Sequence, residues 1–406
     1  MFKYILKRIM LAILTILIII VVVYTVTALF QKDPFVTLEG AGNNANIKEQ
    51  NLKLANTYFL KDKNGDWVPV LDRLALYLFG NKFLGIPIYF RSSTQELLQS
   101  LPIAAGSEQI ETIYGIFEGN PGPIFLPENA PGINISEIPV EKQIPLLFFR
   151  PLKYTIGVTL PSFIISAILG VTLGVVSGYK RGKFLDTFIN SASLLFVAIP
   201  SFVLAPLIIK WGLALGFPPS YLPIGEYTLS EVIKSYLPII FIISISSLSG
   251  YIIYTRNQVV SVLNSNYVLI AKSKGLNQSQ IFFKYVLRNI SIPLVAIIIP
   301  SYIILLSGSI VIERYWNIPG TSTIIVNSFQ KGETNIIMFN VLFFSLLSVF
   351  TAIIVDVAIA LMDPRIKYSS NTPNSIFKRL IAWRIRREKI KQFKINSLQQ
   401  KGEANV

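Results

Sequence analysis

The residue types that most often carry chemistry are scarce in this chain of 406 residues. It contains no cysteine and no histidine, which excludes thiol catalysis, disulfide frameworks, histidine proton relays and the usual zinc ligand sets. Within its long apolar segments, Lys210 and Asp356 are the clear ionisable groups. Lys210 could act in function or simply snorkel from a segment end, and for Asp356 we favour a hydrogen-bonded or Arg-paired structural anchor over a substrate contact. This inventory indicates a chain that is not an enzyme.

Two polar runs resemble ligand-binding loops but have the wrong spacing. The run Gly178–Lys183 contains glycines and lysines, yet no Ser or Thr follows the last lysine as in a phosphate-binding loop. The run Asp62–Asp66 offers oxygen ligands but lacks the full spacing and the distal glutamate of a calcium loop. We therefore expect no cofactor and no metal to be bound by this chain.

The composition predicts a helical membrane protein. Hydrophobic residues make up 52% of the chain, and its mean hydropathy is +0.55. A helix of about 20 residues spans roughly 30 Å, the thickness of a hydrocarbon core. Six segments are long and apolar enough: 11–30, 152–179, 187–217, 238–260, 291–312 and 336–362. We expect Pro200 and Pro206 to interrupt the third, and the first to be a retained helix rather than a cleaved signal peptide.

The charge distribution predicts an orientation. With the amino terminus inside, segments 1–8, 180–186, 256–288 and 363–406 face the cytoplasm and carry 22 Lys and Arg against 4 Asp and Glu. The outer segments 31–150, 218–237 and 313–335 carry 13 against 17. This asymmetry follows the positive-inside rule, so both termini are expected in the cytoplasm of a multi-pass plasma-membrane protein. It also explains the net charge of +15 without a nucleic-acid partner.

The chain divides into four expected parts: a first transmembrane helix (1–30), an extracellular domain (31–150), a membrane core (151–367) and a basic cytoplasmic tail (368–406). The second part is polar and has strand and turn signals, among them a hairpin with Asn64 and Gly65 at its turn. We expect it to be a mixed α/β insertion. Residues 378–394 of the tail could form a basic amphipathic helix on anionic membrane lipid, or be solvated and partly disordered.

The stretch Asn266–Pro293 lies between two apolar segments and carries four basic residues and no acid. Its first half has helical spacing, and Gly275 breaks the turn after Lys274. Its second half begins a new helix with apolar residues from Ile281 to Val286. A short basic helix, a glycine bend and a helix entering the membrane form a protrusion suited to docking a moving partner.

Several motifs resemble the permeases of ATP-binding-cassette (ABC) importers of the dipeptide and oligopeptide type. Ala271–Leu276, Tyr285–Asn289 and Ile292–Pro293 resemble the family's cytoplasmic "EAA" loop, although Leu269 and Ile270 depart from its start. Further resemblances are Ile199–Phe202, Tyr221–Pro223, Asn317–Gly320, Asp356 and Asp363–Arg365. Together these motifs lie between residues 150 and 367, more than half of the chain.

The resemblance implies an all-α polytopic protein with the six transmembrane helices of the type I ABC importer permease fold. It implies a pathway for dipeptides or oligopeptides, or for oligosaccharides as in archaea, at an interface with a second homologous permease. Two ATPase subunits, which hold the ATP and Mg²⁺, would dock on a coupling helix at 265–283, and an extracellular solute-binding protein would deliver cargo. The alternative is an ion-coupled secondary transporter or a membrane-tethered receptor without an ATPase.

The resemblance also assigns roles to individual residues. The ATPase-coupling residues are Tyr267, Ala271, Lys272, Lys274, Gly275, Leu276, Phe282 and Phe283. The translocation-pathway residues are Pro200, Ser201, Pro300 and Ser307, and the structural residues are Asp356, Asp363 and Arg365. Ala271 would pack closely in a groove of the ATPase, and Lys272 and Lys274 would meet its acidic or carbonyl groups or only reflect the positive-inside bias.

Overall fold

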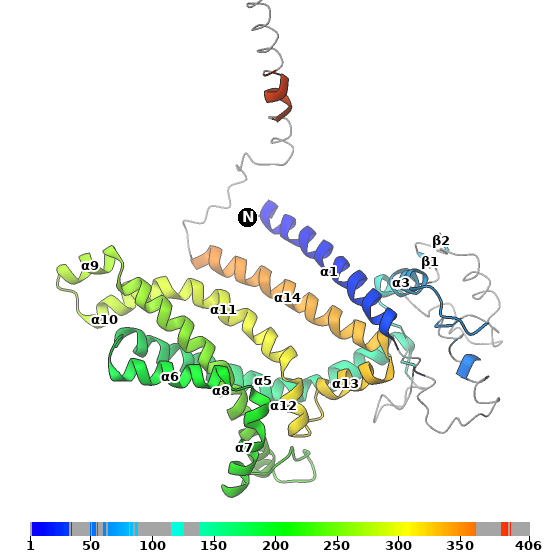
Figure 1. Cartoon of the computed structure of the whole chain (residues 1–406), viewed down its shortest axis with the longest axis horizontal. Coiled ribbons are helices and arrows are strands. Elements are labelled where there is room, and N and C mark those ends of the chain that lie inside the picture. The colour runs from blue at the N-terminus through cyan, green and yellow to red at the C-terminus, as the bar shows by residue number, and fades with distance from the viewer. Residues whose placement is uncertain are drawn as a thin grey trace, which may run out of the picture. The chain divides into compact units, whose positions relative to one another are not determined.

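The computed structural model describes residues 2–31, 34, 49, 51–53, 55, 60–61, 64–80, 82–83, 86–87, 115–122, 124–125, 138–362, 383–388 and 390. Its contacts divide the chain into two compact units, residues 1–11 with 363–406, and residues 12–362. In the first unit, the described residues are the beginning of α1 (Phe2–Phe30) and helical residues near Trp383. The second unit contains the other labelled elements (Figure 1).

Five helices of the described part are long and apolar enough to cross a membrane, or six if one bent pair is a single span. They are α1, α5 (Val140–Tyr179), α8 (Leu229–Leu263), the run of α10 (Gln278–Ile281), η5 (Phe282–Val286), α11 (Leu287–Gly308) and α12 (Ile310–Tyr315), and α14 (Thr334–Met362). The bent pair is α6 (Phe184–Ala198) and α7 (Ser201–Ala214). These helices confirm the predicted helical membrane protein. A helix suits this environment because it satisfies its own backbone hydrogen-bonding groups, which lipid cannot do.

The long helices α5 and α8 pack together along three glycines of α5. A Cβ placed on Gly174 would lie 2.6 Å from Cβ of Thr255 and 2.8 Å from the carbonyl oxygen of Ile252, so only glycine fits. The other members of the row are Gly170 and Gly178, which face Tyr251 and Val259. Small residues spaced by four let two helix backbones approach closely.

The third apolar segment is broken at Pro200, where α6 and α7 meet at an angle of 104°. Pro200 precedes the first residue of α7 and has an extended backbone. A proline lacks a backbone N–H, which costs no hydrogen bond here because the N–H groups at a helix start have no partner within the helix. The predicted interruption is therefore confirmed at Pro200. At Pro206 it is wrong, because α7 continues through that residue to Ala214.

The second half of α1 shares a buried cluster with α3 and with Met338 of α14, and α14 also packs against α11 (Figure 1). Ile20, Tyr24 and Ala28 of α1 form a buried cluster with Met338 of α14. Phe148 of α5 is surrounded by a second cluster from α11 and α14. These contacts arrange the apolar helices around α5, which contacts α6, α8, α11, α13 (Thr321–Lys331) and α14.

The segment between α1 and α5 is described only in part. Its elements are α3 (Val70–Phe79), η2 (Ile116–Glu118) and an antiparallel pair of two-residue strands, β1 (Lys82–Phe83) and β2 (Ile86–Pro87). An antiparallel bridge joins Lys61 to Trp67, with Gly65 at positive φ between them, as the expected hairpin requires. The mixed α/β domain itself remains a prediction.

A buried arginine connects this segment to α1. Arg73 of α3 donates from Nη2 to the carbonyl oxygen of Ala28 (3.3 Å) and from Nη1 to Oε1 of Gln31 (2.9 Å). Its guanidinium also lies over the ring of Trp67, 5.1 Å from the ring centre. Burial lowers the pKa of Arg73, but an arginine keeps its charge at neutral pH. The described part of the insertion is therefore held on the end of α1.

Candidate functional site

The short helix α9 (Asn266–Ser273) lies at one end of the second unit, beside α10 (Figure 1). Val268 and Ala271 are buried, 0% and 1% exposed, in a cluster with residues of α8, α10, η5 and α11. On the other side of α9, Leu269 and Ile270 are 54% and 55% exposed. The helix is thus anchored by two residues and presents an apolar face outward.

A glycine bend follows α9. Gly275 has φ of +78°, a left-handed conformation that residues with a Cβ rarely adopt. The backbone N–H of Gly275 donates to the carbonyl oxygen of Lys272 (2.9 Å), and that of Leu276 to Ala271 (3.3 Å). No atom lies within 4 Å of a Cβ placed on Gly275, so the requirement for glycine is conformational and not steric. The predicted helix break is at this residue.

The next helix begins with a reciprocal cap and a widened turn. The side chain of Asn277 accepts from the N–H of Gln280 (2.8 Å), and Gln280 accepts in return from the N–H of Asn277 (3.1 Å). After α10, η5 is a π-helical turn that continues into α11. Phe283 is exposed, and Phe282 is partly buried and has an edge contact with Tyr179 of α5.

The structure divides the eight predicted coupling residues into two groups. Tyr267, Lys272, Lys274, Gly275 and Phe283 are exposed. Leu276 and Phe282 are partly buried in the chain's own cluster, and Ala271 is fully packed there. Ala271 packs against residues of α8 and η5 of its own chain, and its predicted place in a partner's groove stays a prediction. Leu269 and Ile270, which the sequence interpretation read only as a departure from the family motif, are the exposed apolar residues instead.

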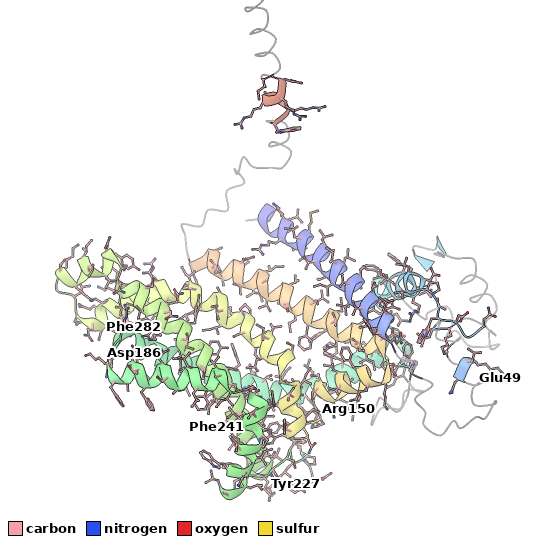
Figure 2. The ribbon with its side chains drawn as sticks, in the orientation of Figure 1. Glu49, Arg150, Asp186, Tyr227, Phe241 and Phe282 are labelled. Carbon is pink, nitrogen blue, oxygen red and sulfur yellow. The ribbon has the colours of Figure 1, made fainter. Side chains whose placement is uncertain are left out.

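An ion pair lies at the same end of the bundle, where Figure 2 labels Asp186 and Phe282. Asp186 at the start of α6 accepts from Nε and Nη2 of Arg256 on α8, at 2.6 and 2.8 Å. It also accepts from Oγ of Ser177 (2.6 Å) and the N–H of Gly182 (2.9 Å). One nearly buried carboxylate thereby joins the end of α5, the start of α6 and the end of α8. The sequence interpretation missed this pair.

A cavity of about 530 Å³ lies between α7, α8 and α11. Hydroxyl groups line it among apolar side chains, and none of its lining residues is Asp, Glu, Lys or Arg. Of the four predicted pathway residues, Ser201 lines this cavity, and Pro200 is its neighbour at the start of α7. Pro300 and Ser307 do not line it, but the adjacent residues Ser301 and Gly308 do. The assignment of these four residues to a translocation pathway stays a prediction.

The three predicted structural residues have different outcomes. Asp356 is half-buried within α14, while Asp363 and Arg365 lie outside the described residues. Lys210 is exposed and lies four residues before the end of α7. Among the described residues, no group of His, Cys, Asp or Glu is arranged to hold a metal ion.

Comparison with known proteins gives one matching family. Residues 170–368 match the family described as binding-protein-dependent transport system inner membrane component. The oligopeptide transport system permease protein OppB of Mycoplasma genitalium is 32% identical over 237 residues, which cover 58% of this chain and 58% of that protein. The dipeptide transport system permease protein DppB of Bacillus subtilis is 32% identical over 217 residues, covering 53% of this chain and 68% of that protein.

The match does not extend over the full length of these relatives. The chain spans 58% and 62% of the lengths of the two Mycoplasma OppB proteins. Among solved structures, an inward-facing MetNI methionine ABC transporter has a TM-score of 0.42 at 16% identity, covering 54% of this chain and 98% of that one.

Proposed function

This chain belongs to the family of binding-protein-dependent transport system inner membrane components, and from that premise we propose that it is a permease subunit of an ABC importer. Its several apolar helices make it a multi-pass membrane protein. We propose peptides as its cargo, because several similar proteins are named for oligopeptide or dipeptide transport. The chain would form one side of the pathway, with a second permease as the other side.

The exposed face of α9 is the observation that carries this proposal. Leu269 and Ile270 are apolar and exposed, beside the exposed Lys272 and Lys274. An exposed apolar patch with a polar rim is typical of a protein–protein contact. Val268 and Ala271 fix α9 to α8 and α11, so force on this face would be transmitted to two membrane helices. We propose that an ATPase subunit docks here, with one such contact on each permease.

The remaining features of the proposal follow from this docking. The docking face would be cytoplasmic, in agreement with the positive-inside distribution, and both termini would be on that side. ATP and Mg²⁺ would be bound by the ATPase subunits and not by this chain. A solute-binding protein would deliver cargo at the opposite face, near the insertion between α1 and α5.

Substitution of Gly275 tests the coupling role. In the complex reconstituted with its ATPases and binding protein, Gly275→Leu strains a left-handed backbone and should abolish substrate-stimulated ATP hydrolysis and uptake while membrane insertion is retained. Gly275→Asn is the matched control, because asparagine tolerates positive φ and should retain most of the activity.

Two outcomes would contradict the proposal. Normal coupled uptake in Gly275→Leu would remove the role assigned to the bend. Uptake by this chain alone, driven by an ion gradient without any ATPase, would favour the secondary-transporter alternative.

A further inference from the structure

We propose that the cavity between α7, α8 and α11 binds main-chain N–H groups of a peptide in transit through hydroxyl oxygens whose own protons are already used. This inference rests on the proposed function and specifies the chemistry of the pathway wall. Tyr251 of α8 and Ser309, which follows α11, both line the cavity, and both side chains are only 5% exposed. They are therefore built into the wall and are not incidental surface groups.

The hydrogen bonds of Tyr251 leave its oxygen as an acceptor. The Tyr251 hydroxyl and Oγ of Ser301 are 2.5 Å apart. Ser301 donates its single proton to the carbonyl oxygen of Ile298 (2.6 Å), so Tyr251 must be the donor in the pair that they form. The Tyr251 oxygen then has lone pairs but no free proton, and it can bind only a donor from the cavity.

The Ser309 hydroxyl is also committed as a donor. Its Oγ donates to Oε1 of Glu313 (2.6 Å), a carboxyl that is fully buried behind the wall. The Ser309 oxygen is therefore also left as an acceptor. The hydrogen bond to the carboxyl oxygen polarises the Ser309 hydroxyl, because hydrogen bonds in a chain polarise one another. Two acceptors thus line a single cavity.

The rest of the lining favours an uncharged ligand. Ser246 also lines the cavity, and its buried hydroxyl has no hydrogen-bond partner in the described structure. The other lining residues are mostly apolar. No lining side chain carries a charge, so a charged group would lose its hydration here without compensation from this wall. Peptide main-chain amides are neutral N–H donors and are present in every peptide regardless of its side chains. The wall therefore suits a transporter that accepts peptides of varied sequence.

The test compares peptides with and without an N–H donor. Hexapeptides N-methylated at one main-chain nitrogen at a time are compared with the unmethylated parent for uptake by the full reconstituted complex with its binding protein. The same binding protein is used throughout, so its own selectivity cancels when permease variants are compared. For at least one methylation site, Tyr251→Phe should reduce the preference for the parent peptide by roughly three- to tenfold, the effect of one hydrogen bond.

Two further variants make the result decisive. Ser246→Ala removes a hydroxyl that has no partner in the described structure, so it should fold normally and also reduce the preference. Ser249→Ala is the matched control: Ser249 is buried on the same helix but does not line the cavity, and the preference should be unchanged. An unchanged preference in Tyr251→Phe and Ser246→Ala, with uptake intact, would overturn the inference and leave the proposed function standing. A parent complex that takes up no peptide would instead overturn the proposed function.

Discussion

At the residue scale, the Asp186–Arg256 pair connects α5, α6 and α8 through one carboxylate. The side chain of Asp186 is 4% exposed, and that of Arg256 is 21% exposed. Both carboxylate oxygens of Asp186 accept hydrogen bonds from the charged Arg256, and each also accepts one from a neutral donor. Paired in this way, each group compensates the lost hydration of the other. Removal of one partner leaves the other as a poorly solvated charge.

We therefore expect Asp186→Ala to destabilise the protein by about 3 kcal/mol, the typical cost of breaking a buried pair. The loss should be measured as a lower midpoint of thermal unfolding in detergent. Asp186→Ala combined with Arg256→Met removes both charges, so the double variant should be more stable than Asp186→Ala alone. A double variant less stable than the single one would show that the pair does not act through charge.

Single residues were predictable from the sequence where their role is local. Gly275 ends a helical pattern, and its positive φ follows from that position alone. Asp186 and Arg256 are 70 positions apart, and no spacing rule links an acid at the start of one helix to a base near the end of another. The side to which Ala271 points was also not predictable, because that depends on which neighbour covers α9.

At the element scale, the packing of α5 on α8 depends on the absence of side chains. The backbone of α8 approaches so closely that a methyl group on Gly174 would overlap Thr255 and the Ile252 carbonyl group. The second atom belongs to backbone and cannot move aside. The two helices would have to separate to admit any larger residue.

We expect Gly174→Ala to destabilise the protein by about 1–3 kcal/mol, the usual cost of overpacking. Gly157→Ala is the control on the same helix, because no atom lies within 4 Å of a Cβ there. Alanine is a better helix former than glycine, so Gly157→Ala should be neutral or slightly stabilising. Equal losses in the two variants, measured by unfolding in detergent, would show that close approach is not the reason for the glycines.

Element boundaries show which signals the sequence interpretation overlooked. Helix α8 begins at Leu229, nine residues before the expected start at Pro238, because Thr228 and Glu231 form a reciprocal cap. The pattern Thr-x-x-Glu was present and could have located this start. Helix α5 begins at Val140 instead of Leu152 and runs through three prolines, which on local rules alone argue for a break. Tertiary contacts such as those of the fully buried Ile144 and Phe148 override that preference.

At the scale of the whole molecule, the apolar segments and the family were predictable, because hydropathy and short motifs are local properties. The cavity was not, since it is formed by faces of α7, α8 and α11 that only the packing brings together. The orientation of the chain in the membrane is predicted by the charge asymmetry between its loops. It remains a prediction to be measured.

The absence of native cysteine makes that measurement clean, because any introduced thiol is the only one in the chain. Lys274, beside the bend after α9, and Glu226, in the loop before α8, are both exposed. We expect a membrane-impermeant maleimide added to intact cells to label Glu226→Cys and not Lys274→Cys, and to label both after the membrane is permeabilised. Labelling of Lys274→Cys in intact cells would place α9 outside, where no cytoplasmic ATPase could reach Leu269 and Ile270. Force could then not enter the bundle through α8 and α11, and the proposed coupling would be untenable.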